Sequence, residues 1–297
     1  MTEIAQEKRS PAIMIEQLKA LLDVEEIDRD LYRGARARGS RGRVFGGQVI
    51  GQALVAASKS VDDDRPIHSL HAYFMRPGDT ALPIIYRVVR DHDGGSFSTR
   101  RVIAMQRGVP ILNMAASFQR PEEGLSHQFA MPVVPPPEDL ISEEQHFRTH
   151  IDQVPESMRD WVLRPRHIEL RPVQQRFPIE MRSHEPVQQT WFRAVAPLGD
   201  DPLVHRATLA FASDMVLLGT SMIPHDVDWM KPDLQSASLD HSLWLHDVFR
   251  ADDWLLYATD SPWAGHARGF NRGSIFTREG RLVASVAQEG LVRLRKS

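Results

Sequence analysis

Cysteine is absent from the 297-residue sequence, and no uninterrupted apolar run approaches the length of a membrane-spanning helix. Without cysteine there can be no disulfide bond, thiolate zinc site or cysteine nucleophile. The first residues, MTEIAQEKRS, are charged and lack the apolar segment of a signal peptide. We therefore expect a soluble, cytoplasmic protein with no membrane span.

The sequence also lacks an excess of charge of either sign. It contains 36 Lys and Arg against 39 Asp and Glu, a net charge of −3, with no long run of one sign. Nucleic-acid-binding surfaces concentrate basic residues to neutralise phosphates. We therefore expect no nucleic-acid partner, whereas a small anionic ligand is compatible with this balance.

Several catalytic motifs are missing. No Gly-x-Ser-x-Gly segment is present, since GGSFS and RGSIF lack the second glycine, and GGQVIG is not followed by Lys-Ser or Lys-Thr. These absences argue against an α/β-hydrolase nucleophile and a phosphate-binding loop. His68 and His71 lie three residues apart in a predicted strand, so they would face opposite sides and could not bind one metal ion together. We expect no metal and no cofactor.

What the sequence does contain is a faint internal repeat, divided by a proline-rich segment. The segment RPEEGLSHQFAMPVVPPPEDLISEEQH has five prolines and predicts an extended linker. On each side the chain follows the order helix, strand with an embedded histidine, and hairpin closed by a glycine turn, at Gly108 and at Gly280. We predict an N-terminal domain at 14–120, a linker at 121–150 and a C-terminal domain at 151–297.

The two predicted helices, FGGQVIGQALVAASKSV and RATLAFASDMVLLGT, are apolar on nearly every side. A helix of this kind must be covered on most of its faces, for instance by a strongly curved antiparallel sheet. The expected fold class is therefore α+β, with two copies of a long helix wrapped by such a sheet.

Three polar side chains of the second half are candidates for a site. Gln288 lies on the apolar face of the alternating segment LVASVAQEGLVRLR, and Ala116 takes its place when the two glycine turns are superposed. Asp214 falls on the apolar stripe of the second helix, where a lone carboxylate is costly, and Ser238 lies in the predicted strand SASLDHSLWLH. Each has a structural alternative: an internal anchor for Asp214, a solvated strand face for Ser238 and a bridging amide for Gln288. Their common place in the second half favours one shared site.

Ordered blocks of sequence cover nearly the whole chain, from about residue 15 to 295. They include VFGGQVIGQAL, HSLHAYFMRPGD, ASDMVLL, LDHSLWLH, ARGF and LVASVAQEG. In order and spacing these blocks resemble the acyl-CoA thioesterase II family, the TesB-like double-hotdog thioesterases. The resemblance implies a tandem pair of hotdog domains and the hydrolysis of acyl-CoA thioesters to free fatty acid and CoA, a hydrolase activity of fatty acid metabolism.

The resemblance also implies an active site composed of Asp214, Ser238 and Gln288. Asp214 would activate a water molecule as a general base, or attack the thioester directly, and the other two side chains would position the water. Ser238 departs from the bacterial pattern, which has threonine there. The hydroxyl group is kept, so we expect the chemistry to be retained.

Four further residues are candidates for contacts with the substrate or with CoA. Arg268 and Arg272 in ARGFNRG could bind phosphate, although charged hairpin residues are usually solvated. His68 and His71 match a block of the family and are expected near the domain interface or the substrate path.

Two other functions are compatible with the fold that the resemblance implies. One is a non-catalytic acyl-CoA-binding protein, and the other is a hotdog hydratase or dehydratase, which typically carries a histidine five residues after the aspartate. Here Gly219 stands five residues after Asp214. By resemblance alone we expect a homo-oligomer, a dimer or a tetramer.

Overall fold

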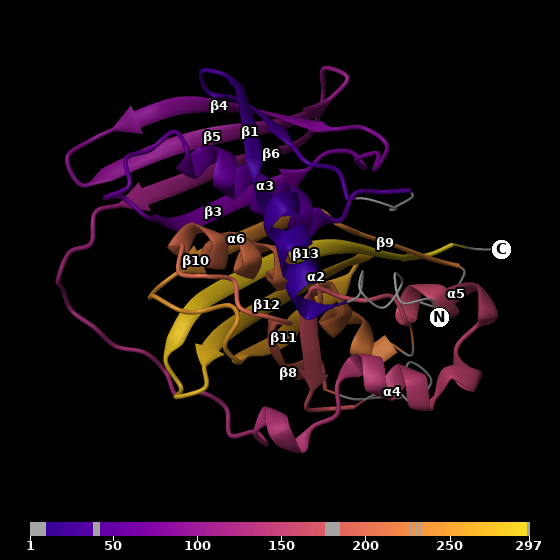
Figure 1. Cartoon of the computed structure of the whole chain (residues 1–297). Coiled ribbons are helices and arrows are strands. Elements are labelled where there is room, and N and C mark those ends of the chain that lie inside the picture. The colour runs from indigo at the N-terminus through magenta and orange to yellow at the C-terminus, as the bar shows by residue number, and fades with distance from the viewer. Residues whose placement is uncertain are drawn as a thin grey trace.

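The computed structural model describes residues 10–37, 42–175, 185–225, 227, 229, 231 and 233–295. The first nine residues, on which the expectation of no signal peptide rests, lie outside this part of the chain. Its dominant feature is one 13-stranded antiparallel sheet that curves around two helices (Figure 1). The α+β class with two wrapped helices is therefore confirmed. The strands of the two halves form one continuous sheet.

Twelve strands follow one another across the sheet, and the thirteenth pairs beside them. In spatial order they are β1 (Val24–Asp28), β2 (Leu31–Gly34), β4 (Ile84–Asp93), β5 (Phe97–Gln106), β6 (Val109–Gln119), β3 (Ile67–Phe74), β10 (Asp240–Leu245), β13 (Leu282–Leu294), β12 (Arg268–Thr277), β11 (Leu255–Gly265), β8 (Val187–Ala194) and β7 (Ile168–Pro172), with β9 (Leu234–Ser238) paired to β13.

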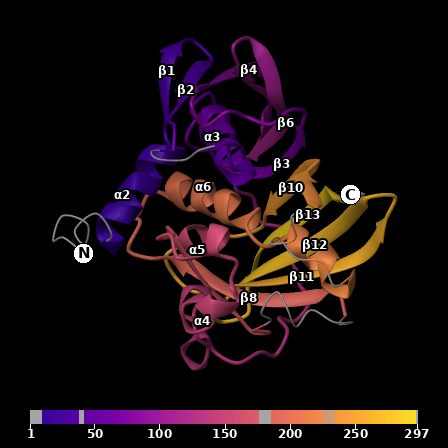
Figure 2. The ribbon, with the colours of Figure 1, turned by 90° about the vertical axis from the view of Figure 1, so that its right-hand side faces the viewer.

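The helices differ in length and position. They are α2 (Pro11–Leu22), α3 (Gly46–Ser58), α4 (Glu143–Thr149), α5 (Glu156–Val162) and α6 (Pro202–Ser213), with the 3-10 helices η1 (Pro137–Asp139), η2 (Ile151–Gln153) and η4 (Leu218–His225). Strands of the first half enclose α3, and α6 lies beside it toward the second half (Figure 2). Almost every residue of α3 is buried, as an apolar helix inside a curved sheet requires.

The two halves join along the pair formed by β3 and β10. These strands are antiparallel, with Leu70 opposite Leu243, and both leucines are buried against the core. The helices repeat this relation, because α3 and α6 run antiparallel with Gly47 near Phe211 and Gly51 near the carbonyl of Ala207. Each half therefore contributes one strand and one central helix to the junction, and α2 also packs against α6.

Two predicted elements differ from those observed. The second helix was expected over 206–220, but α6 stops at Ser213 and η4 begins only at Leu218. Asp214 is therefore the C-cap of α6 and not a mid-helix residue. The expected extended linker also contains α4, which Ser142 caps by accepting a hydrogen bond from the N–H of Gln145. Apolar periodicity does not separate an α-helix from a following 3-10 turn, which explains the first error.

Two strands also depart from regular alternation. The expected strand over 236–246 is interrupted at Leu239, whose N–H bonds to the carbonyl of Glu289. In β3 the register shifts between Ile67 and Ser69. Because a bulge changes the face to which a side chain points, His68 is turned to the outer face of the sheet, and the expectation that it faces away from His71 is wrong.

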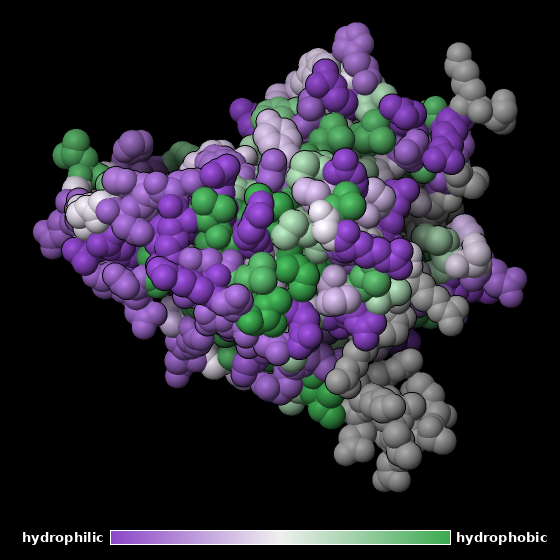
Figure 3. Space-filling model, turned by 90° about the horizontal axis from the view of Figure 1, so that it is seen from above, coloured by the Kyte–Doolittle hydropathy of each residue, from purple (hydrophilic) through white to green (hydrophobic). Residues whose placement is uncertain are grey.

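The apolar content of the chain is concentrated inside. One stretch, Pro202–His225, is long and apolar enough to cross a membrane, but 72% of its most apolar window is buried, as in the core helix of a folded domain. The face seen from above is covered mainly by hydrophilic residues, with apolar residues in small separate groups (Figure 3).

Candidate active site

Asp214 lies where the two central helices meet. It is the C-cap of α6, with φ −87° and ψ −5°, and its N–H bonds to the carbonyl of Ala212. Its side chain is only 4% exposed. The carboxylate faces the first turn of α3, so a residue of the second half contacts a helix of the first half.

Two side chains donate hydrogen bonds to the same carboxylate oxygen. Gln288 Nε2, on β13, lies 2.7 Å from Asp214 Oδ1, and Ser238 Oγ, at the end of β9, lies 3.2 Å from it. The pairing of Ser238 with Gly290 holds β9 against β13 at this point. The structure therefore brings together the three residues that the sequence singled out, and Ser238 is half-buried.

The first turn of α3 completes the surroundings of the carboxylate. Its N-cap residue, Phe45, has no side chain that could accept a hydrogen bond from the helix, and the N–H of Gly47 donates to Asp214 instead. A Cβ atom on Gly46 would lie 2.6 Å from Asp214 Oδ2, which is too close for such a contact. Asp214 thus caps α3 from the other half of the chain, and the helix N-terminus favours its negative charge.

Burial dominates the electrostatics of the site. Removal of the Asp214 carboxyl group from water raises its pKa from 3.8 to about 6, against the opposing effects of the hydrogen bonds from Gln288, Ser238 and the Gly47 N–H. A carboxylate with this pKa is ionised at neutral pH and is a stronger base than an exposed one. Asp214 can therefore accept a proton close to neutral pH.

Two buried polar residues of the site were missed by the sequence analysis. His241, on β10, is fully buried, and its Nδ1 and Nε2 contact Gln288 Nε2 at 3.2 Å and Ser213 Oγ at 2.9 Å. Asn271, on β12, is also fully buried and lies directly opposite Gln288. The sequence held one usable signal for His241, because the triplet His-Ser-Leu occurs at the same place in both halves.

Two buried carbonyl oxygens at the site have no hydrogen-bond partner in the described structure. They are Gln288 Oε1 and Asn271 Oδ1. Buried polar atoms are nearly always satisfied by protein or by ordered water. The pair therefore indicates a place for a donor such as water close to Asp214.

The other four candidate residues lie on the outer face of the sheet. Arg268 pairs with Glu289 and Arg272 pairs with Asp260. The inward positions opposite each other on β12 and β13 are Asn271 and Gln288, so the alternate residues point outward.

The two histidines lie on this outer face as well. His71 bonds to Ser242 Oγ and packs edge-on against Trp244, while His68 bonds to Ser117 Oγ. The structure does not bring either histidine, or either arginine, to Asp214.

The first half lacks a matching site. Counted from the first residue of each helix, Ser58 of α3 holds the place of Asp214. Arg65 stands three residues before the repeated His-Ser-Leu triplet, as Ser238 does, and Ala116 corresponds to Gln288. A hydroxyl, a guanidinium and a methyl group thus replace the carboxylate, hydroxyl and amide.

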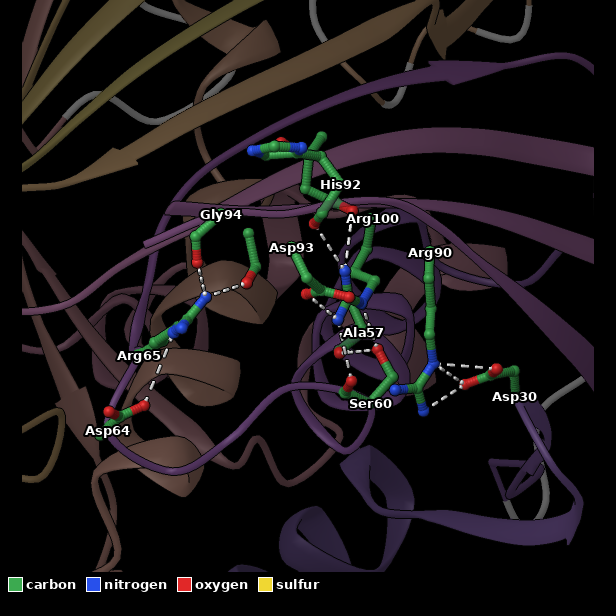
Figure 4. A network of polar contacts seen from close by, with 12 residues as sticks. Asp30, Ala57, Ser60, Asp64, Arg65, Arg90, His92, Asp93, Gly94 and Arg100 are labelled. Carbon is green, nitrogen blue, oxygen red and sulfur yellow. Dashed lines mark hydrogen bonds and ion pairs between the residues drawn. The ribbon is translucent and has the colours of Figure 1, made fainter. Parts of the chain in front are cut away.

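Arg100 fills the corresponding space in the first half. It lies opposite Ala116 as Asn271 lies opposite Gln288, and it is 1% exposed. Its guanidinium donates to Ser60 Oγ at 2.9 Å and to Asp93 Oδ1 at 2.7 Å, and further to the carbonyls of Ser60, His92 and Thr99 (Figure 4). The arginine satisfies its donors within the protein, so this copy of the site is closed.

The arrangement around Asp214 suits proton transfer to and from a bound water. A buried base of raised pKa lies beside a fixed amide, a hydroxyl group and a free carbonyl oxygen. Within the described part of the chain, no group of three or more His, Asp or Glu side chains is placed to bind a metal ion. The chemistry that these residues can supply themselves is general acid–base catalysis.

Comparisons with known proteins agree with this fold. Two family models match, one described as acyl-CoA thioesterase over residues 164–291 and one as the acyl-CoA thioesterase N-terminal domain over residues 36–119. The human acyl-coenzyme A thioesterase 8 is 42% identical over 290 residues, which cover 93% of this chain and 88% of the human protein.

Solved structures give the same result. The acyl-CoA thioesterase II TesB2 of Mycobacterium marinum is 42% identical, with a TM-score of 0.77 over 95% of this chain and 99% of that one. A hot dog fold protein of unknown function from Alicyclobacillus acidocaldarius is only 18% identical, but its TM-score of 0.76 over 94% of this chain and 98% of that one shows the same fold. The chain has the tandem hotdog fold and belongs to the acyl-CoA thioesterase family of thioester hydrolases.

Proposed function

We propose that this protein hydrolyses acyl-CoA thioesters to free fatty acid and CoA with Asp214, Ser238 and Gln288 as catalytic residues. The observation that carries the proposal is the convergence of the Gln288 amide and the Ser238 hydroxyl on one oxygen of a buried carboxylate. Burial raises the pKa of that carboxyl to about 6, which matches a general base that works near neutral pH.

The reaction needs one water and no other reactant. Asp214 takes a proton from the water while the oxygen of the water attacks the thioester carbonyl carbon. The N-terminus of α3 favours the negative charge that develops on the carbonyl oxygen. The carbon–sulfur bond then breaks, and the proton on Asp214 passes to the departing CoA thiolate. Gln288 and Ser238 fix the carboxylate, and the free Gln288 carbonyl oxygen accepts a hydrogen bond from the water.

The apolar groups beside the site fit an acyl chain. The rings of Phe45 and Phe211 lie 5.1 Å apart at the start of α3, and the ring of Phe74 approaches Gly46 from β3. Phe45 is 38% exposed, so this apolar wall reaches the surface. An acyl chain along it would hold its thioester group near Asp214.

The geometry favours a base over a nucleophile for Asp214. Direct attack would bring the thioester carbon into bonding contact with a carboxylate that is only 4% exposed and whose Oδ1 already accepts two hydrogen bonds, whereas a base needs only a small water molecule to reach Oδ2. A dehydratase would need a histidine able to exchange protons with the substrate. His241 has both ring nitrogens in contact with protein groups, and burial lowers its pKa to about 3.

Three expectations from the sequence stay predictions. They are a location in the cytoplasm, a dimeric or tetrameric assembly, and contacts with substrate or CoA by Arg268, Arg272, His68 and His71. These four side chains lie on the outer face of the sheet, away from Asp214. They could therefore bind only a part of the ligand that extends to that face.

The proposal is tested by the release of CoA from acyl-CoAs of increasing chain length, followed with a thiol reagent. Because the protein has no cysteine, every thiol detected comes from the substrate. We expect turnover by the native protein and a fall of about 100-fold or more in Asp214→Asn. Arg101→Gln, which changes an exposed arginine paired with Asp91 on the first half, is the matched control and should keep native turnover.

Two results would argue against the proposal. If acyl-CoA binds but no CoA is released by the native protein, the protein is an acyl-CoA binder. If Asp214→Asn turns over acyl-CoA at the native rate, the reaction does not use this site.

A further inference from the structure

We propose that His241 is a positioning residue, whose neutral imidazole holds the Gln288 side chain with its carbonyl oxygen directed at the catalytic water. The proposal rests on the proposed thioester hydrolysis at Asp214 and deepens it. The observation behind it is a buried chain of hydrogen bonds that runs from Ser213 through His241 to Gln288 and ends at Asp214.

The direction of this chain follows from the hydroxyl group at its start. Ser213 Oγ donates its only proton to the carbonyl of Ala210, at 3.0 Å. At its 2.9 Å contact with His241 Nε2 the hydroxyl oxygen must therefore accept, and the proton lies on Nε2. The Nδ1 atom of the neutral ring then carries a lone pair and can only accept.

This lone pair determines the orientation of the Gln288 amide. At 3.2 Å from Nδ1 the group that faces the ring has to be the NH₂ group, because a carbonyl oxygen there would meet another lone pair. The second N–H of the same nitrogen points to Asp214 Oδ1 at 2.7 Å. Both donors are used, and the carbonyl oxygen is left buried without a protein partner.

The contact with His241 matters most after the proton transfer. While Asp214 is ionised, its charge alone keeps the NH₂ group facing it. Once Asp214 has taken the proton of the water, its OH group could attract the Gln288 carbonyl and turn the amide over. The Nδ1 lone pair opposes this rotation in both protonation states of Asp214, so the amide keeps one orientation through the cycle.

The test compares two substitutions of similar size. His241→Asn retains an acceptor near the position of Nδ1, and His241→Leu does not. We expect His241→Leu to lower kcat for CoA release about tenfold or more with KM within about twofold of native, and His241→Asn to recover most of kcat. Equal losses in the two variants, no loss in either, or a change in KM alone would overturn the proposal.

A second measurement does not depend on turnover or on the folding of a variant. Nitrogen-15 NMR of histidine-labelled native protein reports which ring nitrogen carries the proton. We expect His241 to be neutral, with the proton on Nε2. A proton on Nδ1 would overturn the proposal for His241 even if the protein hydrolyses acyl-CoA. If the proton lies on Nε2 but the protein shows no turnover, the hydrogen-bond chain is supported and the proposed thioester hydrolysis is rejected.

Discussion

At the scale of single residues, the main feature is a carboxyl group that is buried without a cationic partner among its described contacts. Asp214 is stabilised by three neutral donors, from Gln288, Ser238 and the N–H of Gly47. These hydrogen bonds lower its pKa, but burial raises it by more. The residue is therefore a stronger base than a surface aspartate, at a cost in stability when it ionises.

The first prediction concerns the pH dependence of the rate. A general base must be deprotonated to act, so kcat/KM should fall about tenfold per pH unit below the pKa of Asp214, which is about 6, and level off above it. Steady-state CoA release between pH 5 and 8 measures this. A value of kcat/KM that stays level down to pH 5 would contradict the assignment.

The second prediction concerns stability. The Asp214 pKa is about 6 in the folded protein and near 3.8 in the unfolded chain, so the folded state holds the extra proton between these values. Its contribution to stability is complete below pH 3.8 and is lost as pH rises to 6 and beyond, by about 3 kcal/mol at 1.36 kcal/mol per pKa unit.

Asp214→Asn removes this titration. Relative to the native protein, the variant should gain free energy of unfolding as pH rises from 4 to 7, and urea unfolding at several pH values measures the difference. A difference that does not change with pH would mean that Asp214 ionises in the folded protein as readily as in the unfolded chain.

Residue patterns in the sequence were sufficient to select Asp214 and Gln288, because each is a polar group on an apolar face. Ser238 lies on a polar strand face, and its place in the site came from the family resemblance. The patterns were insufficient for His241 and Asn271. His241 belongs to a strand whose regular alternation is broken at Leu239, so its inward face could not be read from period two. Asn271 lies in a hairpin rich in glycine and charged residues, so a polar side chain there does not stand out as an exception on an apolar face.

At the scale of elements, the proposed active site depends on a helix that cannot cap itself. The N-terminus of α6 is capped by its own Asp201, which accepts from the N–H of Leu203. In contrast, α3 begins at Gly46 after Phe45 and relies on Asp214 of the other half. The Asp214 carboxylate and the start of α3 therefore fix each other in position.

The third prediction follows from this close approach. In Gly46→Ala the new methyl group would lie 2.6 Å from Asp214 Oδ2 and 3.0 Å from Phe74 Cζ, so the carboxylate must move. We expect kcat to fall about tenfold or more, since small displacements of catalytic groups are costly. Gly95→Ala, where a methyl group meets no atom within 4 Å, is the control. Equal kcat in the two variants would argue against a fixed carboxylate.

The elements themselves were largely predictable, and their ends were not. The α3 helix and both glycine-turn hairpins follow from periodicity and from Gly108 and Gly280, whose φ values of 76° and 87° favour glycine. The end of α6 at Ser213 could not be read, because the apolar residues continue into η4. The cap that stops the helix depends on contacts with the other half, which no local pattern contains.

At the scale of the whole molecule, two similar halves carry one site. The sheet and the helix pair are shared almost equally, but only the second half has the carboxylate, hydroxyl and amide. In the first half Arg100 occupies the space and bonds to Ser60, two residues after the end of α3. We therefore propose that this position of the repeat serves catalysis in the second half and stability in the first.

The fourth prediction tests this division. Arg100→Met should remove the donors of the buried carbonyl of Ser60 and of the half-buried carbonyls near it, and lower the free energy of unfolding by about 3 kcal/mol. Because the closed copy lies in the other half of the sheet from Asp214, kcat should stay within about twofold of native. Thermal unfolding and CoA release measure the two quantities, and a loss of kcat without a loss of stability would show that Arg100 takes part in the reaction.

In the proposed function, Asp214, Ser238 and Gln288 act together on a thioester through a positioned water. The most direct measurement is kcat for CoA release by Gln288→Ala beside native protein, at saturating acyl-CoA and with folding checked by circular dichroism. We expect kcat to fall about 100-fold or more, because the variant loses both the donor to Asp214 and the acceptor for the water. A folded Gln288→Ala protein with native kcat would contradict it.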